Sequence, residues 1–113
     1  MPPEIVKVYS ENAEFQQIES LRRSRTKRQK HREFFVEGMR SINLALQHHW
    51  SINAFVYPAD APLSGWAKEI LEHSTAKRHI ELPLELVRKL SGKEDTSELL
   101  ALVAMPPDDL TRI

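Results

Sequence analysis

The feature that most constrains the fold is an unbroken run of six apolar residues near the C-terminal end, residues 99–104. Successive side chains of a strand point to opposite faces of a sheet, so a strand with one solvent-facing side alternates apolar and polar residues. This run does not alternate. It therefore predicts a strand that is buried on both faces, as in a sheet that lies between two layers of helices.

The residues upstream of this run fit that arrangement. From residue 33 onward, short apolar runs at residues 34–36, 52–57 and 79–82 alternate with segments whose apolar residues recur at helical spacing. Such alternation of strands and helices is typical of a layered α/β domain. We therefore predict that residues 33–105 form a mixed sheet of four or more strands with helices on both faces.

Size and composition narrow the class of protein. The chain of 113 residues matches one compact domain. No run approaches the roughly 20 apolar residues that are needed to span a bilayer. The chain has no cysteine, which excludes disulfides and thiolate metal sites and fits a reducing compartment. We expect a cytoplasmic protein with no membrane segment.

Positive charge is concentrated in one short segment. The net charge of the chain is zero, but residues 1–32 carry eight Lys or Arg against four Glu. Seven of these basic residues lie within residues 22–32, the basic segment, which contains no acidic and no apolar residue. Such a cluster attracts phosphates through Coulomb attraction and counterion release, although a solvated helix face is the alternative. The predicted contacts are Arg22, Arg23, Arg25, Lys27, Arg28, Lys30 and Arg32.

Two amphipathic helices are predicted near this segment. Residues 11–23 place Phe15, Ile18 and Leu21 three apart on one stripe, with Ser10 or Asn12 as the cap. A second helix begins after the strand at residues 34–36. The residues that we expect to share one face of it are Met39, Ile42, Ala45, Leu46 and His49.

A search for catalytic residues finds none. The three glycines are isolated, and the sequence has no phosphate-binding loop, nucleophile elbow or zinc-ligand spacing. His48 and His49 are adjacent, so on a helix their side chains point about 100° apart and do not converge on one metal. We expect no catalytic residue, no cofactor-binding residue and no metal site in this chain.

Residues 30–40 carry a motif that extends from the basic segment into the first strand of the predicted domain. They read Lys-His-Arg-Glu-Phe-Phe-Val-Glu-Gly-Met-Arg. A basic stretch followed by a strand of the form Phe-hydrophobic-Val-Glu-Gly resembles the start of the substrate-binding domain of SpoU/TrmH-type RNA methyltransferases. The resemblance continues, in the order of the later strands and helices, over residues 15–107. One departure is Glu98-Leu99, where many relatives have a Gln-Gly pair.

This resemblance implies a three-layer α/β/α sandwich similar to ribosomal-protein RNA-binding folds. It also implies a following knotted domain, absent from this chain, that binds S-adenosylmethionine and methylates a ribose 2′-hydroxyl of ribosomal or transfer RNA. Residues 1–32 are then an N-terminal extension with a basic helix, residues 33–105 the RNA substrate-binding domain, and residues 106–113 the start of a linker. The expected partners are RNA and the protein's own C-terminal catalytic domain, with this piece monomeric and the parent protein a homodimer.

Within the motif, Phe35, Glu37 and Gly38 are candidate family positions. A structural role is the alternative for Glu37 and Gly38, because a glycine suits the turn from strand to helix. Arg40 is the better candidate for an RNA contact, since a cation in the first turn of a helix gains nothing from the helix dipole. Two other functions remain open: a stand-alone ribosomal or kink-turn RNA-binding protein of the same fold, and a protein-interaction module whose basic segment contacts an acidic partner.

Overall fold

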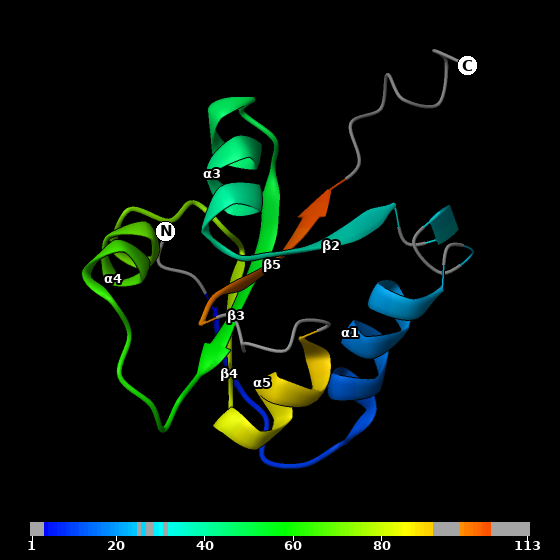
Figure 1. The fold of residues 1–113 in the computed structure, drawn as a ribbon. Coiled ribbons are helices and arrows are strands. Elements are labelled where there is room, and N and C mark those ends of the chain that lie inside the picture. The colour runs from blue at the N-terminus through cyan, green and yellow to red at the C-terminus, as the bar shows by residue number, and fades with distance from the viewer. Residues whose placement is uncertain (1–3, 25, 27–28, 31, 92–97, 105–113) are drawn as a thin grey trace.

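The computed structural model describes residues 4–24, 26, 29–30, 32–91 and 98–104. Within these residues, strands and helices alternate along the chain, with five strands and four fully described helices (Figure 1). In order they are β1 (Glu4–Lys7), α1 (Ala13–Arg23), β2 (Glu33–Glu37), α3 (Met39–Gln47), β3 (Ile52–Pro58), α4 (Gly65–Glu72), β4 (Arg78–Leu82), α5 (Leu84–Leu90) and β5 (Leu100–Ala104).

The strands form one mixed sheet in the order β1-β4-β3-β5-β2. Strands β1, β4 and β3 pair in parallel, whereas β5 runs antiparallel to both β3 and β2. The predicted mixed sheet with helices on both faces is confirmed. The division at residue 32 is different in the structure, because β1 pairs with β4 and α1 packs against the sheet. Residues 4–24 are therefore part of the domain and not an extension ahead of it.

Helices α1 and α5 cover one face of the sheet, here called the α1/α5 face (Figure 1). The stripe predicted for α1 is confirmed, since Phe15, Ile18 and Leu21 are buried against it. Asn12 supplies the cap, and its side-chain oxygen accepts a hydrogen bond of 3.0 Å from the backbone N–H of Phe15. The sheet contributes alternate residues of its central strands to this core.

Helices α3 and α4 cover the opposite face, here called the α3/α4 face (Figure 1). In β5, Leu100 and Leu102 point to the α1/α5 face while Ala101 and Val103 point to this one, so the predicted burial on both faces is confirmed. Ser64 caps α4 and accepts from the N–H of Ala67 at 3.2 Å.

The prediction for the inner face of α3 is only partly right. Ile42 and Ala45 are fully buried, but Met39 is 52% exposed, Leu46 is 37% exposed and His49 is exposed. The helix ends at Gln47, so His49 lies beyond it in a left-handed conformation with φ 59°. Met39 and Leu46 flank the narrow stripe formed by Ile42 and Ala45. Part of the apolar surface of α3 is therefore left open to solvent.

Candidate nucleic-acid interface

The basic segment joins the end of α1 to the start of β2, at the right of Figure 1. Lys30 and Arg32 are exposed, and Arg32 has the left-handed backbone angle φ 55° directly before β2 begins. Arg25, Lys27 and Arg28 lie outside the described residues. The side chains of Arg22 and Arg23 are also not described. Arg32 thus lies at the amino-terminal end of β2, and most side chains of the basic segment are not described.

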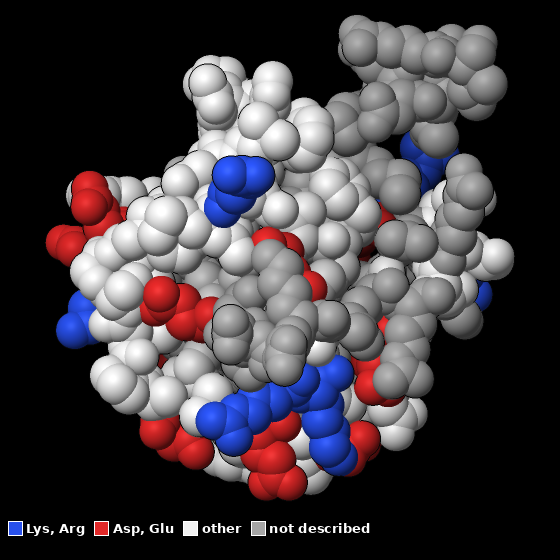
Figure 2. All heavy atoms as spheres, in the orientation of Figure 1, with Lys and Arg blue, Asp and Glu red and all other residues white. Residues whose placement is uncertain are grey.

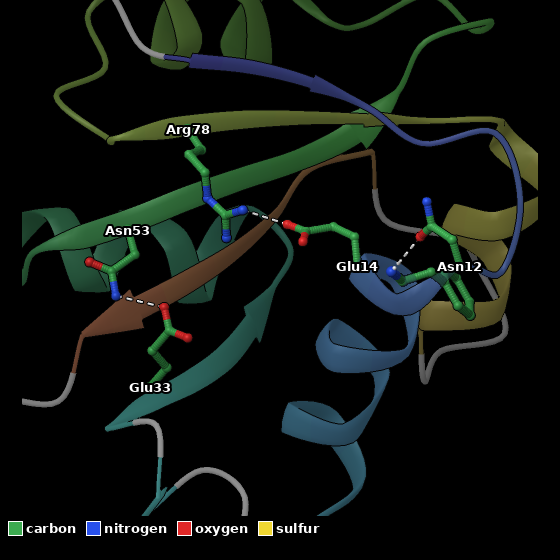
Figure 3. Close-up of polar contacts among 6 residues, drawn as sticks. Asn12, Glu14, Glu33, Asn53 and Arg78 are labelled. Atoms are coloured by element: carbon green, nitrogen blue, oxygen red, sulfur yellow. Dashed lines mark hydrogen bonds and ion pairs between the residues drawn. The ribbon is translucent and has the colours of Figure 1, made fainter.

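Polar side chains from four elements form contacts near the amino-terminal ends of β2, β3 and β4 (Figure 3). The amide of Asn53 on β3 donates a hydrogen bond of 2.6 Å to Glu33 at the start of β2. Arg78, the first residue of β4, forms an ion pair with Glu14 in the first turn of α1. Both carboxylates are therefore engaged within the domain. The ion pair also offsets the negative charge of Glu14 at this end of the sheet.

Arg40 lies at the start of α3 and is exposed. It is the one charged residue in the sequence of α3, and Figure 2 shows a basic patch over this helix surrounded by uncharged atoms. Arg40 lines an open groove of about 580 Å³ together with Met39, Asn43 and Leu44. A cation beside exposed apolar side chains can contact both a phosphate and the face of a base.

The structure does not bring Arg40 and the basic segment together. Arg32 precedes the first residue of β2, whereas Arg40 follows its last residue. A strand of five residues spans roughly 16 Å at about 3.3 Å per residue. The two predicted contacts therefore lie at opposite ends of β2, and one nucleic acid would have to extend over about this distance to touch both.

The motif residues Phe35, Glu37 and Gly38 hold the domain together. Phe35 packs against the α1/α5 core. The carboxylate of Glu37 accepts a hydrogen bond of 2.8 Å from the hydroxyl of Ser91, which follows α5. Gly38 has φ 89° and ψ 161°, a conformation that is essentially restricted to glycine. These contacts support the structural alternative for Glu37 and Gly38.

Glu98, at the departure from the family pattern, also has a structural contact. Its carboxylate accepts a hydrogen bond of 2.7 Å from the backbone N–H of Ser64. Ser64 is the N-terminal cap of α4, so this bond ties the residue before β5 to the start of that helix. A carboxylate near the N-terminus of a helix is also favoured by the helix dipole.

Sequence reasoning missed His79 and Tyr9. His79 on β4 is buried, and its Nε2 has no hydrogen-bond partner among the described residues. Burial lowers the pKa of His79, and the negative charge of Glu81 partly opposes this effect. Tyr9 follows β1 and is 76% exposed. In the sequence, the only signal for the burial of His79 is its position within a predicted strand. No feature of the sequence around Tyr9 shows whether its ring is exposed or buried.

The remaining site predictions concern metals and membranes. Within the described ranges, no cluster of three or more His, Cys, Asp or Glu residues is arranged to hold a metal ion. His48 stacks on Trp50 with ring centroids 5.7 Å apart. Among the helices that the structure describes, none is long and apolar enough to cross a bilayer.

Known proteins are similar to this chain in sequence and in fold. The chain is 38% identical over 112 residues to the 23S rRNA (uridine(2479)-2′-O)-methyltransferase of Streptomyces viridochromogenes, a match that covers 98% of this chain and 39% of that protein. The crystal structure of the SpoU methyltransferase AviRb from the same organism, in complex with AdoMet, is 40% identical with a TM-score of 0.80 and covers 90% of this chain and 38% of that one. An rRNA methyltransferase from Sinorhizobium meliloti, 17% identical with a TM-score of 0.74 over 91% of this chain and 38% of that one, has the same fold.

These matches confirm the expected resemblance and fold. The chain spans about two fifths of the length of the curated relative that it matches. The family model described as the SpoU L30e-like domain matches residues 12–101, which is most of the chain and includes α1. The chain therefore belongs to the SpoU L30e-like domain family.

Proposed function

We propose that this chain is the RNA-recognition domain of an S-adenosylmethionine-dependent RNA 2′-O-ribose methyltransferase, and that its substrate is ribosomal RNA. The observation that carries the proposal is the 38% identity to a 23S rRNA 2′-O-methyltransferase over 98% of this chain. Because the match covers 39% of that relative, the domain supplies substrate recognition and the remainder of such a protein supplies the chemistry.

The basic segment is the main proposed contact. Seven Lys or Arg in eleven positions, without an acidic residue between them, favour binding to a phosphate backbone. Lys30 and Arg32 are exposed, and the adjacent carboxylate of Glu33 accepts a hydrogen bond from Asn53. Arg40 provides a second contact at the other end of β2.

The cofactor does not fit the residues of this domain. The largely apolar cavity of about 360 Å³ between α3 and α4 is lined by Phe55, Trp66 and Ile70. Its polar lining residues include His73 and Glu69. Glycine lets the backbone approach a ligand closely. Gly65, at the start of α4, is not in such a crowded position, because a Cβ added there would meet no atom within 4 Å. S-adenosylmethionine is therefore assigned to the catalytic domain of the parent protein.

The other partners follow from this assignment. The domain is proposed to act as a monomer beside its own C-terminal catalytic domain, in a parent protein that is a cytoplasmic homodimer. Proteins recognise RNA mainly by its shape and by its unpaired bases, and transfer RNA has both features. Transfer RNA is therefore the competing substrate, and binding assays in parallel on ribosomal and transfer RNA distinguish the two.

Charge reversal tests the proposed contact surface. Replacing Arg25, Arg28 and Arg32 together by Glu should lower the affinity for labelled fragments of 23S ribosomal RNA by about a hundredfold or more, because three phosphate contacts become repulsive. Fluorescence anisotropy titrations give the dissociation constants. A thermal unfolding curve close to that of the wild type shows that the variant is folded.

A matched variant separates local contacts from net charge. Lys68, Lys77 and Arg88 are exposed and lie outside the basic segment. Their replacement by Glu changes the net charge by the same amount, and it should weaken binding far less. An equal loss in both variants, or a loss within twofold in the first, would show that the basic segment is not the RNA-binding surface.

A further inference from the structure

A pocket lies at the carboxyl-terminal ends of β1, β3 and β4, away from the basic segment. Its volume is about 340 Å³, and the residues that line it include Lys7, Tyr9, Asp60, Glu81 and Pro83. The parallel pairing of these three strands brings their ends to one edge of the sheet. Lys7 is the register partner of Glu81, and the N–H of Val8 donates to the carbonyl of Glu81 at 2.9 Å. The chain thus delivers Tyr9 to the mouth of this pocket.

Tyr9 is the most exposed of the large hydrophobic side chains that the structure places on the surface. Tyr9, which follows β1, is 76% exposed, compared with 49% for Ile5 within that strand. Exposing an aromatic ring to water is unfavourable, so a ring at the rim of a pocket is a candidate for contact with a ligand. Aromatic rings of this kind are the surfaces on which unpaired bases of RNA stack.

The charged side chains in the pocket determine whether it binds a phosphate or a base of RNA. Asp60 and Glu81 contribute two carboxylates against one cation, Lys7, and a phosphate is therefore repelled. Both carboxylates are held in place, since Asp60 accepts from the N–H of Leu84 at 2.7 Å and Glu81 accepts from the hydroxyl of Tyr57 at 3.0 Å. Each retains further acceptor positions, which suit the amino groups of cytosine, adenine or guanine.

We infer that this pocket binds an unpaired, amino-bearing base of the RNA, with Tyr9 as the stacking surface and the carboxylates of Glu81 and Asp60 as acceptors for its N–H groups. The inference rests on the proposed RNA-binding function and adds a base-selective site to it. Uracil has no exocyclic amino group, so the pocket discriminates against it. Lys7 lines the same pocket and can donate a hydrogen bond to a base carbonyl.

The site is tested with short single-stranded oligoribonucleotides of cytidine, adenosine and uridine. Anisotropy titrations should show tighter binding of oligo(C) and oligo(A) than of oligo(U). Tyr9→Ala should weaken binding of oligo(C) by about tenfold, the usual effect of removing one stacking ring. Tyr9→Phe should retain wild-type affinity because it keeps the ring, and Ile5→Ala serves as a matched control on the exposed side of β1.

A second variant tests the acceptors separately from stacking. Glu81→Gln keeps an oxygen for the hydroxyl of Tyr57 but places an N–H₂ group in the pocket. It should remove the preference for oligo(C) over oligo(U) while leaving the thermal midpoint close to that of the wild type. Unchanged affinity in Tyr9→Ala together with an unchanged preference in Glu81→Gln would overturn the base-binding site and leave the proposed function standing. Absence of RNA binding by the wild-type chain would overturn both.

Discussion

The two faces of the sheet are packed in different ways. On the α1/α5 face, Phe15, Ile18 and Leu21 of α1 are at most 2% exposed. At the edges of this layer, one ion pair joins α1 to β4 through Glu14 and Arg78. A second ion pair, between Lys89 and Glu11 at 2.6 Å, joins α5 to the segment that precedes α1. On the α3/α4 face, aromatic rings replace much of the aliphatic packing, and a cavity of about 360 Å³ lies between α3 and α4.

The layer of α1 and α5 therefore mainly stabilises the domain, whereas the layer of α3 and α4 exposes apolar surface that a partner could contact. Exposed large hydrophobic residues are found at Met39, Leu44 and Leu46 of α3, whereas the apolar stripe of α1 is fully covered. The face of α3 also carries Arg40 and few other charges (Figure 2). We therefore expect substitutions in α1 to change stability and substitutions on the outer side of α3 to change binding.

The largest effect is expected in the core of the α1/α5 face. Phe15→Ala removes a fully buried ring and should lower the free energy of unfolding by about 3–5 kcal/mol. Met39→Ala, at a residue that is 52% exposed, should lower it by less than about 0.5 kcal/mol. Urea unfolding followed by circular dichroism measures both. Similar losses in the two variants would remove the distinction between the layers.

A smaller effect on the free energy of unfolding is expected at the residue before α3. Gly38→Ala forces a side chain into a backbone conformation at φ 89° and ψ 161°, which should cost about 1–3 kcal/mol. Gly65→Ala is the matched control, because a Cβ at Gly65 would meet no atom within 4 Å. That variant should gain about 0.4–1 kcal/mol through the unfolded state. If Gly38→Ala were as stable as the wild type, the turn into α3 would not depend on glycine.

The smallest effect concerns the buried histidine of the α3/α4 face. Burial lowers the pKa of His79 below its usual value of about 6.5. As the pH falls below that value, the unfolded chain takes up a proton before the folded chain does, so the free energy of unfolding decreases. Each unit of pKa difference corresponds to about 1.4 kcal/mol.

Chemical denaturation between about pH 7.5 and 5.5 measures this contribution. His79→Phe should flatten the decrease, because Phe does not titrate. An identical pH dependence in His79→Phe and the wild type would show that His79 is readily protonated within the fold.

Much of the fold was predictable because local patterns carry it. The unbroken apolar run of β5, the stripe Phe15, Ile18 and Leu21, and the cap at Asn12 each follow from short-range spacing and were confirmed. The position of β1 was not predictable in this way. Its four residues become a strand of the sheet through parallel pairing with β4, about seventy residues later, and no local pattern encodes that partner.

The candidate site was less predictable for the same reason. Charge density identified the basic segment from sequence, and it remains a prediction because most of its side chains lie outside the described residues. The pocket at Tyr9 joins β1, β4 and the residues after β3, so it exists only once the sheet has formed. The separation of Arg32 from Arg40 by the length of β2 likewise needed the structure.

The central claim, that this domain recognises RNA through its basic segment, is tested most directly by the salt dependence of binding. The dissociation constant for labelled fragments of 23S ribosomal RNA is measured from about 50 to 200 mM salt. If four or more phosphates are contacted, the logarithm of the association constant should fall against the logarithm of salt concentration with a slope of about −3 or steeper. The slope should be near zero for the variant with Arg25, Arg28 and Arg32 replaced by Glu. A wild-type slope near zero, or no binding at the lowest salt concentration, would contradict the account.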